Sequence, residues 1–346
     1  MNTATHDIFA ILSFGLAALA SLSGCASTPR VGDTLPRTGD EIVIAGQYFH
    51  TGVPVVLWTD PGGYDAYRVE KRFAPWESSD WKSSAAGLDS PNRYGLRVGP
   101  TESEREAVRG GGWPLALLQQ HVDQFVIHYD VCGTSRTCFR VLHDQRGLSV
   151  HFMLDLDGTI YQTLDVKERA WHASIANDRS VGIEIAHIGA YPPGKPSPLD
   201  TWYVTEEGPE PITRVVLPER LGDGGIRTPN FVATASRAGR ILGEINGSPY
   251  EMHDLTDQQY HALAHLTAAL NAALPRLEIQ APRDADGRVL TRTLTPAEFA
   301  SYSGLIGHFH VTQNKVDPGP AFDWQRVLDQ AREIRNDPPR VGPLPG

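Results

Sequence analysis

The sequence predicts a mixed α/β domain, of the α+β kind, in which helices flank a central mixed β-sheet. Short apolar runs at residues 123–129 and 180–185 are typical of buried strands. Residues 149–162 contain two strand-like runs joined by Asp157-Gly158, which is a hairpin signal. Helical patterns follow later in the chain, so we expect strands and helices to pack into one domain.

The chain begins with an apolar segment of the length of a signal sequence. Residues 8–20 are apolar but short for a membrane span. They lead to Leu22-Ser23-Gly24-Cys25, which resembles a bacterial lipoprotein cleavage box. We therefore expect residues 1–25 to be a lipoprotein-type signal segment with Cys25 as the lipidated residue. An ordinary secretory signal is the alternative, because the first residues contain no Lys or Arg.

Proline and glycine divide the rest of the chain. Residues 53–58 form a β-prone run, and Pro54 confines it to a sheet edge or a strand start. Residues 192–230 are rich in Pro and Gly and are expected to form a long surface loop. The predicted organisation is a tether at 26–40, a β-rich N-terminal extension at 41–112, a main domain at 113–336 with insertions near 192–230 and 278–302, and a disordered tail at 337–346.

Three helices are predicted in the second half of the chain. The first covers Phe231–Ile245. Residues 256–259 form a capping box that opens a second helix, which runs to about Leu274. His261 and His265 on that helix have a spacing that can bind zinc. Without the glutamate of a His-Glu-x-x-His motif, we interpret them as a solvated or packed face. The third helix covers residues 322–335.

The segment from Gly307 to Pro320 concentrates chemically active side chains. It holds His308, His310, Lys315 and Asp317. Imidazole and carboxylate groups are ligands of catalytic zinc, which uses three protein ligands and keeps one open position. A lysine two residues before the carboxylate could stabilise negative charge that develops on a substrate oxygen.

Two residues far upstream could complete such a site. His128 ends the strand predicted at 123–129, where its ring can point into the space above the sheet. Taken alone, such a histidine is more often a hydrogen-bonded core residue. Glu184 lies between two isoleucines in the strand at 180–185, so it either faces a cleft or is a buried charge that needs a partner.

Together these segments resemble the zinc-dependent N-acetylmuramoyl-L-alanine amidases of type 2, a family that includes the peptidoglycan recognition proteins. The matching order is a strand that ends in histidine, the hairpin at 149–162, Trp171-His172-Ala173, the strand at 180–185 and the Gly307–Pro320 segment. The resemblance covers about residues 115–335, with insertions.

The resemblance implies the fold of that family and one Zn²⁺ held by His128, His308 and Asp317. Glu184 sits where many members place the acid/base, and Lys315 where the family places the lysine that stabilises the oxyanion. These roles are expectations carried over from the family.

Three further histidines are candidate substrate-binding residues. His172 belongs to the Trp-His-Ala motif, which looks like part of the substrate cleft. His151 is a weaker candidate, either as a residue that lines the cleft or as one that supports the site from behind. His308 and His310 are two residues apart, so on a strand they would share a face. The Gly-His context favours His308 as the ligand and leaves His310 to hydrogen-bond or to line the cleft.

Cys132 and Cys138 lie just after His128. Export makes a disulfide between these two cysteines possible. Peptidoglycan recognition proteins carry a similar short-loop disulfide beside their first ligand strand, so the resemblance implies a Cys132–Cys138 disulfide. A structural zinc site at these cysteines is a poor alternative, since it would need four soft ligands.

The expected function is zinc-dependent hydrolysis of the amide between N-acetylmuramic acid and L-alanine in peptidoglycan or muropeptides. The expected location is the cell envelope, as an outer-membrane lipoprotein facing the periplasm. A formal net charge of −10 argues against nucleic-acid binding and against general electrostatic capture of an anionic cell wall. The alternatives are a non-catalytic peptidoglycan-binding protein of the same fold, a zinc peptidase that cuts the stem peptide, and a cytosolic recycling amidase, which conflicts with the signal segment.

Overall fold

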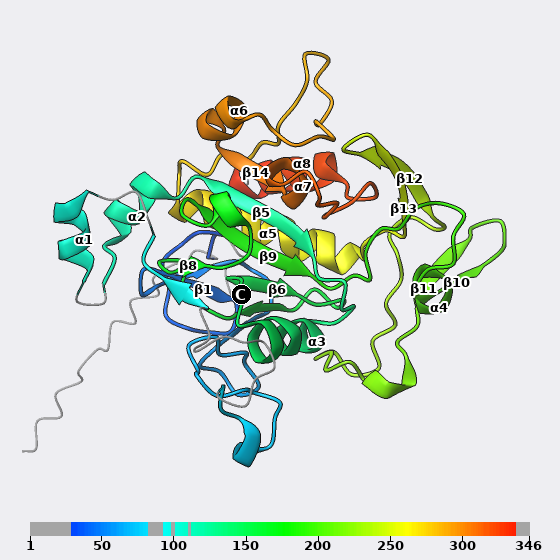
Figure 1. The fold of residues 1–346 in the computed structure, drawn as a ribbon, viewed down its shortest axis with the longest axis horizontal. Helices are drawn as coiled ribbons and strands as arrows, with labels where there is room; N and C mark the ends of the chain where they lie inside the picture. The colour runs from blue at the N-terminus through cyan, green and yellow to red at the C-terminus, as the bar shows by residue number, and fades with distance from the viewer. Residues whose placement is uncertain (1–28, 82–92, 98–100, 110–111, 337–346) are drawn as a thin grey trace, which may run out of the picture. The chain divides into compact units, whose positions relative to one another are not determined.

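A six-stranded sheet forms the centre of the computed structural model, which describes residues 29–81, 93–97, 101–109 and 112–336. Its strand order is β14-β5-β9-β6-β7-β3, and neighbouring strands are parallel except in the β6–β7 hairpin. Figure 1 shows β14, β5, β9 and β6 in this order. The mixed α/β prediction is therefore confirmed. The strands are β3 (Val55–Leu57), β5 (Gln124–Tyr129), β6 (Phe152–Leu154), β7 (Ile160–Gln162), β9 (Ser180–Ile185) and β14 (Gly304–Gly307).

Two long helices, α5 (Asp257–Ala273) and α8 (Trp324–Asn336), cover one face of the sheet. Successive side chains of a strand point to opposite faces. Phe125 and Ile127 of β5 therefore share a buried cluster with Leu263 of α5 and Leu328 of α8.

The beginning of α5 confirms the predicted capping box. The Thr256 hydroxyl accepts from the backbone N–H of Gln259, and the Gln259 side chain accepts from the backbone N–H of Thr256. The helix predicted at 322–335 corresponds to α8.

The alternate residues of the same strands point to the other face. His128 on β5 and Glu184 on β9 are register partners, so both point away from α5. On this side α3 (Ser135–Phe139) and the π-helical η2 (Arg140–Arg146) pack against Met153 and Tyr161. The strands that carry candidate site residues thus present them toward α3 and η2.

The N-terminal extension adds to the central sheet. Its strand β3 pairs with β7 at the sheet edge, directly after Pro54. The hairpin of β1 (Glu41–Ile44) and β2 (Gln47–His50) is joined to the sheet by Gln162, whose side-chain amide bonds both the N–H and the C=O of Val43. Smaller elements complete this half of the chain: η1 (Trp76–Ser78), β4 (Tyr94–Gly95), α1 (Glu102–Val108), α2 (Leu115–His121), β8 (Arg169–Ala170) and η3 (Ser174–Ala176).

The helix predicted over Phe231–Ile245 is wrong. Residues 241–252 instead form a hairpin of β12 (Ile241–Ile245) and β13 (Ser248–Met252). Its turn is Asn246-Gly247, and both residues have positive φ angles of 51° and 76°. Asn-Gly is the strongest short hairpin signal, because a type I′ turn requires positive φ at both central positions. This turn chemistry outweighed the helical pattern.

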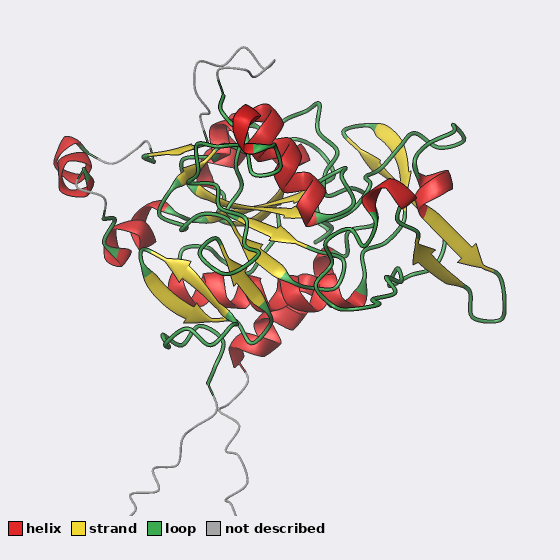
Figure 2. Ribbon diagram, turned by 90° about the horizontal axis from the view of Figure 1, so that it is seen from below, coloured by secondary structure: helices red, strands yellow, loops and turns green. Residues whose placement is uncertain are grey.

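The segment predicted as a long loop at 192–230 also contains a hairpin, β10 (Tyr203–Glu206) with β11 (Ile212–Val215). Figure 2 shows this hairpin and β12–β13 as strands outside the central sheet. The remaining helices are α4 (Leu199–Trp202), η4 (Glu219–Leu221), α6 (Pro296–Ser301) and α7 (His308–Val311).

Within the described ranges, no helix combines the length and the apolar character that a membrane crossing requires. Cys25 and the predicted signal segment lie outside the described residues.

Candidate metal centre and active site

Parallel neighbouring strands bring His128 and Glu184 together. They are register partners near the carboxyl ends of β5 and β9. Residues paired across neighbouring strands point to the same face of a sheet. The two side chains therefore enter one cleft from adjacent strands.

His308 enters the cleft from the strand on the other side of β5. β14 ends at Gly307, the register partner of Ile127, so His308 follows beside His128. A Cβ on Gly307 would lie 2.7 Å from Cδ of Pro318. Glycine therefore allows the Asp317-Pro318 segment to approach the end of β14.

Three ligand-type atoms converge at this point. Asp317 Oδ2 lies 2.8 Å from His128 Nδ1 and 3.0 Å from His308 Nδ1. All three atoms lie within 4.8 Å of one another, and all three residues are buried. Two imidazole nitrogens and a carboxylate oxygen that converge in this way match the protein ligands of a catalytic zinc. The residues therefore fit the metal that the sequence predicts.

The protonation states of these residues also suit a metal. Burial alone would raise the pKa of Asp317, but hydrogen bonds from His128 and His308 outweigh burial and lower it. Burial, reinforced by the charge of His308, lowers the pKa of His128 to about 4. At neutral pH the carboxylate is ionised and the imidazole neutral, which are the forms that bind zinc.

A chain of hydrogen bonds fixes the orientation of His128. His128 Nε2 lies 3.0 Å from His172 Nδ1, and His172 Nε2 lies 3.3 Å from the Ser180 hydroxyl. If His128 binds metal through Nδ1, its Nε2–H donates to His172, whose own N–H then donates to Ser180. A Cβ on Gly182 would lie 2.5 Å from the His172 ring, so glycine leaves room for it. Sequence reasoning found His172 but missed Ser180, the first residue of β9.

Glu184 and Lys315 lie beside the three candidate ligands. Burial, followed by the charges of Asp317 and Asp130, raises the pKa of Glu184 well above its ordinary value, and Lys315 opposes this shift. Such a perturbed carboxyl group in a cleft is a candidate acid/base. The cleft has a volume of about 160 Å³ and is lined by residues that include His128, Tyr129, Cys132, Cys138, Trp171, His172, Glu184, His308, Lys315 and Asp317.

The β12–β13 hairpin holds the loop that carries Lys315. The Asn246 side-chain N–H₂ donates to the carbonyls of Gln313 and Lys315, at 3.0 and 3.3 Å. Its oxygen accepts from the Thr293 N–H at 2.7 Å. Sequence reasoning missed this residue: the Asn-Gly signal indicates a hairpin turn, but not its contact with the loop that carries Lys315.

Residues 118–214 match the family described as N-acetylmuramoyl-L-alanine amidase (Amidase_2). The chain carries a type-2 amidase domain. The matched residues contain His128, His172 and Glu184, whereas His308 and Asp317 lie beyond them. The family match therefore contains only part of the candidate site. The fold brings the remaining residues, His308 and Asp317, next to His128.

A comparison of the amidase with curated proteins finds no match. Among solved structures, a selenomethionine derivative of AmpD is 19% identical, with 61% of this chain and 86% of that chain covered and a TM-score of 0.29. A complex of the N-acetylmuramyl-L-alanine amidase AmiD from E. coli with anhydro-N-acetylmuramic acid-L-Ala-D-gamma-Glu-L-Lys is 18% identical, with 64% and 59% covered and a TM-score of 0.34. The endolysin amidase LysCS from Clostridium intestinale URNW is 15% identical, with 62% and 86% covered and a TM-score of 0.31.

His310 lies away from the amidase cleft. The expectation that His308 and His310 share a strand face is wrong, because both lie on α7, which is one helical turn. Residues two apart on a helix are separated by about 200° around its axis, so the two side chains leave from nearly opposite sides. His310 is fully buried, its Nδ1 accepts from the Gly307 N–H, and its Nε2 donates to the Leu290 carbonyl. Its ring nitrogens are thus occupied by backbone.

His151 is likewise fully buried and does not line the cleft of the amidase. Its Nδ1 accepts from the Gly182 N–H at 3.1 Å, and its Nε2 lies 2.9 Å from the Glu168 carbonyl. His151 therefore bonds to the backbone of β9, and its ring centroid lies 5.9 Å from that of His172, which does line the cleft.

Cys132 and Cys138 line one wall of the cleft as free thiols. Burial raises the pKa of Cys138, and its contact with Cys132 raises it further. The predicted disulfide is not formed in this structure and stays a prediction.

A second hollow, of about 530 Å³, shares Leu148, Trp171 and His172 with the cleft. The Arg169 guanidinium lies over the Trp171 ring at 4.2 Å. Among the described residues, the buried atoms Trp171 Nε1 and Arg169 Nη1 have no hydrogen-bond partner. Arg169 and Trp171 both line this hollow.

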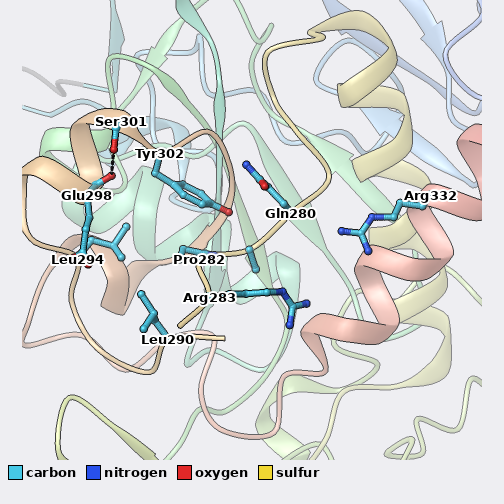
Figure 3. Close-up of a pocket in the computed structure, with 10 residues that line it drawn as sticks. Gln280, Pro282, Arg283, Leu290, Leu294, Glu298, Ser301, Tyr302 and Arg332 are labelled. Carbon is cyan, nitrogen blue, oxygen red and sulfur yellow. Dashed lines mark hydrogen bonds between the residues drawn. The ribbon is translucent and has the colours of Figure 1, made fainter. Parts of the chain in front are cut away.

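A third hollow, of about 550 Å³, lies between residues 280–302 and α8 (Figure 3). Arg283 and Arg332 reach into it, and their guanidinium groups donate to Gln325 and to the Ile279 carbonyl. None of the predicted site residues lines this hollow, so it is not part of the amidase site.

Proposed function

We propose that this amidase hydrolyses the amide between N-acetylmuramic acid and L-alanine in peptidoglycan or muropeptides, and that it requires one Zn²⁺. The observation that carries the proposal is the convergence of His128, His308 and Asp317 within 4.8 Å, in the cleft that holds Glu184 and Lys315. The family match at residues 118–214 supports the choice of bond.

Each residue of the cleft has a distinct proposed role. Zinc held by His128, His308 and Asp317 would polarise the amide carbonyl and lower the pKa of water to about 7. Glu184 takes a proton from the attacking water and passes it to the leaving nitrogen. Lys315 donates to the carbonyl oxygen as negative charge develops there.

The hollow beside the cleft is the proposed place for the sugar. Trp171 and Arg169 line this hollow, and the indole ring offers an aromatic surface on which a sugar can pack. Digestion of purified muropeptides followed by mass spectrometry tests the function, because an amidase and a peptidase leave different products.

Lys315→Ala is expected to lower the turnover rate by about 10²–10³-fold, since it removes one donor to the developing oxyanion. Zinc content should stay unchanged, because Lys315 is not one of the converging ligands. Lys315→Arg, which keeps a cation, should retain more activity than Lys315→Ala. Near-normal turnover of Lys315→Ala would remove the lysine from the mechanism.

Attachment to the outer membrane through Cys25 remains a proposal that rests on the sequence alone. Palmitate label on the wild type that disappears in Cys25→Ala would support it, and label that persists would reject it.

A further inference from the structure

Arg97 is a buried arginine of the N-terminal extension and is only 1% exposed. It ends the segment 93–97, whose strand β4 pairs with β8, the strand that leads directly into Trp171 and His172. Burial lowers the pKa of Arg97 to about 10, so the guanidinium stays charged at neutral pH. A buried charge is costly unless hydrogen bonds compensate for it. The partners of this guanidinium therefore indicate which part of the chain it holds in place.

The Arg97 guanidinium binds main-chain carbonyl oxygens on both sides of β8. In the segment between β8 and β9, Nη1 donates to the carbonyls of Asn177, Asp178 and Ser180, at 3.2, 3.2 and 3.0 Å. Before β8, Nη2 donates to the carbonyl of Val166 at 2.7 Å. A guanidinium carries five N–H donors in a rigid, planar fork, so one side chain can fix several carbonyl groups at once.

Two of the residues that Arg97 binds also hold His172. The Asn177 side-chain oxygen accepts from the backbone N–H of His172 at 3.2 Å. The Ser180 hydroxyl lies 3.3 Å from His172 Nε2. His172 Nδ1 in turn lies 3.0 Å from Nε2 of the candidate ligand His128. Arg97 is therefore connected to the candidate metal centre through two residues that each bond to His172.

We propose that Arg97 is a positioning residue of the amidase, which fixes the segment between β8 and β9 so that the His172 ring is held against His128. This inference rests on the proposed function, since it takes His128 as a zinc ligand. It gives the N-terminal extension a part in the amidase site, although Arg97 lies before residues 118–214, which match the family. Arg97 does not line the cleft, so it acts through His172 and not on the substrate.

The zinc affinity of the full chain, measured by competition with a chelator, tests the proposal. Arg97→Met keeps a long side chain but removes its N–H donors. We expect this variant to bind zinc about tenfold more weakly, the lower end of the loss that follows removal of a group that orients a metal-binding histidine. Arg97→Lys keeps the charge but not the planar fork, so it should retain more of the affinity than Arg97→Met.

Arg93→Met is the matched control. Arg93 is a buried arginine of the same segment, but its guanidinium donates to the carbonyls of Arg68 and His143 and not to Asn177 or Ser180. The folded variant should bind zinc as the wild type does, even if its free energy of unfolding is lower. Equal losses of zinc affinity in Arg93→Met and Arg97→Met would mean that a buried arginine acts only through stability, and would overturn the proposal.

A double-mutant cycle with His172→Leu tests whether Arg97 acts through His172. In the His172→Leu background, Arg97→Met should weaken zinc binding by no more than about a further twofold, because the effects of residues in one hydrogen-bond network do not add. A second loss of about tenfold there would show that Arg97 acts independently of His172, and would overturn the proposal.

If Arg97→Met does not fold, Arg97→Lys and Arg93→Lys provide the same comparison, and only Arg97→Lys should bind zinc more weakly than the wild type. Zinc that is lost in Asp317→Asn but bound normally by a folded Arg97 variant would contradict this inference alone. A wild type that binds no zinc would contradict the proposed function, and this inference with it.

Discussion

Glu184→Gln is expected to lower the rate of amide hydrolysis by about 10²–10⁴-fold, the usual contribution of a positioned acid/base. Glutamine keeps the size of the side chain but cannot take up a proton. Glu184 lies beside His128 on the adjacent strand and lines the cleft. Burial and the charge of Asp317 raise the pKa of Glu184 well above its ordinary value. Turnover of muropeptides and zinc content, measured on the same preparations, check the result.

Glu168→Gln is a matched control for that variant. Burial also raises the pKa of Glu168, whose carboxylate accepts from the Tyr67 hydroxyl, but Glu168 does not line the cleft. Its activity should stay near that of the wild type. Equal losses in both variants would mean that Glu184 acts through stability, and near-normal turnover in Glu184→Gln would exclude it as the acid/base.

Asp317→Asn is expected to lose bound zinc and, with it, nearly all activity. The carboxylate supplies the only negative charge among the three converging ligands, and an amide in its place is a neutral, weak ligand. Asparagine keeps an oxygen near His128 and His308, so the variant should fold better than Asp317→Ala. Metal analysis by mass spectrometry, together with turnover at added zinc, measures both effects.

His310→Gln serves as the comparison for the metal-binding prediction. His310 is buried and bonded to backbone, so its replacement should leave zinc content unchanged even if it lowers stability. Full retention of zinc in Asp317→Asn would remove Asp317 from the ligand set. Loss of zinc in a folded His310→Gln variant would reopen the choice between His308 and His310.

Local sequence signals predicted much of the fold. The capping box at Thr256 and the Asp157-Gly158 turn both lie where the sequence indicates, because caps and tight turns depend on a few adjacent residues. The pairing of β3 with β7 joins residues more than a hundred positions apart, which no local pattern contains. The hairpin at Asn246 was missed since a helical pattern was given more weight than the turn.

The order of the motifs along the chain predicted which residues form the centre of the site. It did not predict the residues that surround them. His128, His308 and Asp317 could be placed together because their motifs occur in a known order. His151 and His310 are buried because the local backbone directs their rings into the protein. The spacing of residues in the sequence does not determine the direction of a ring. Asn246 could not be connected to Lys315, because the contact joins residues 69 positions apart in the sequence.

The most direct test of the central claim is mass spectrometry of muropeptides digested by the purified, zinc-loaded full chain in H₂¹⁸O. The account predicts free peptides that begin with L-alanine, beside peptide-free sugars whose lactyl carboxylate carries one ¹⁸O. Cuts inside the stem peptide, with ¹⁸O in a peptide carboxylate, would make the protein a peptidase. Intact muropeptide that stays bound to the zinc-loaded protein would make it a binding protein and contradict the account.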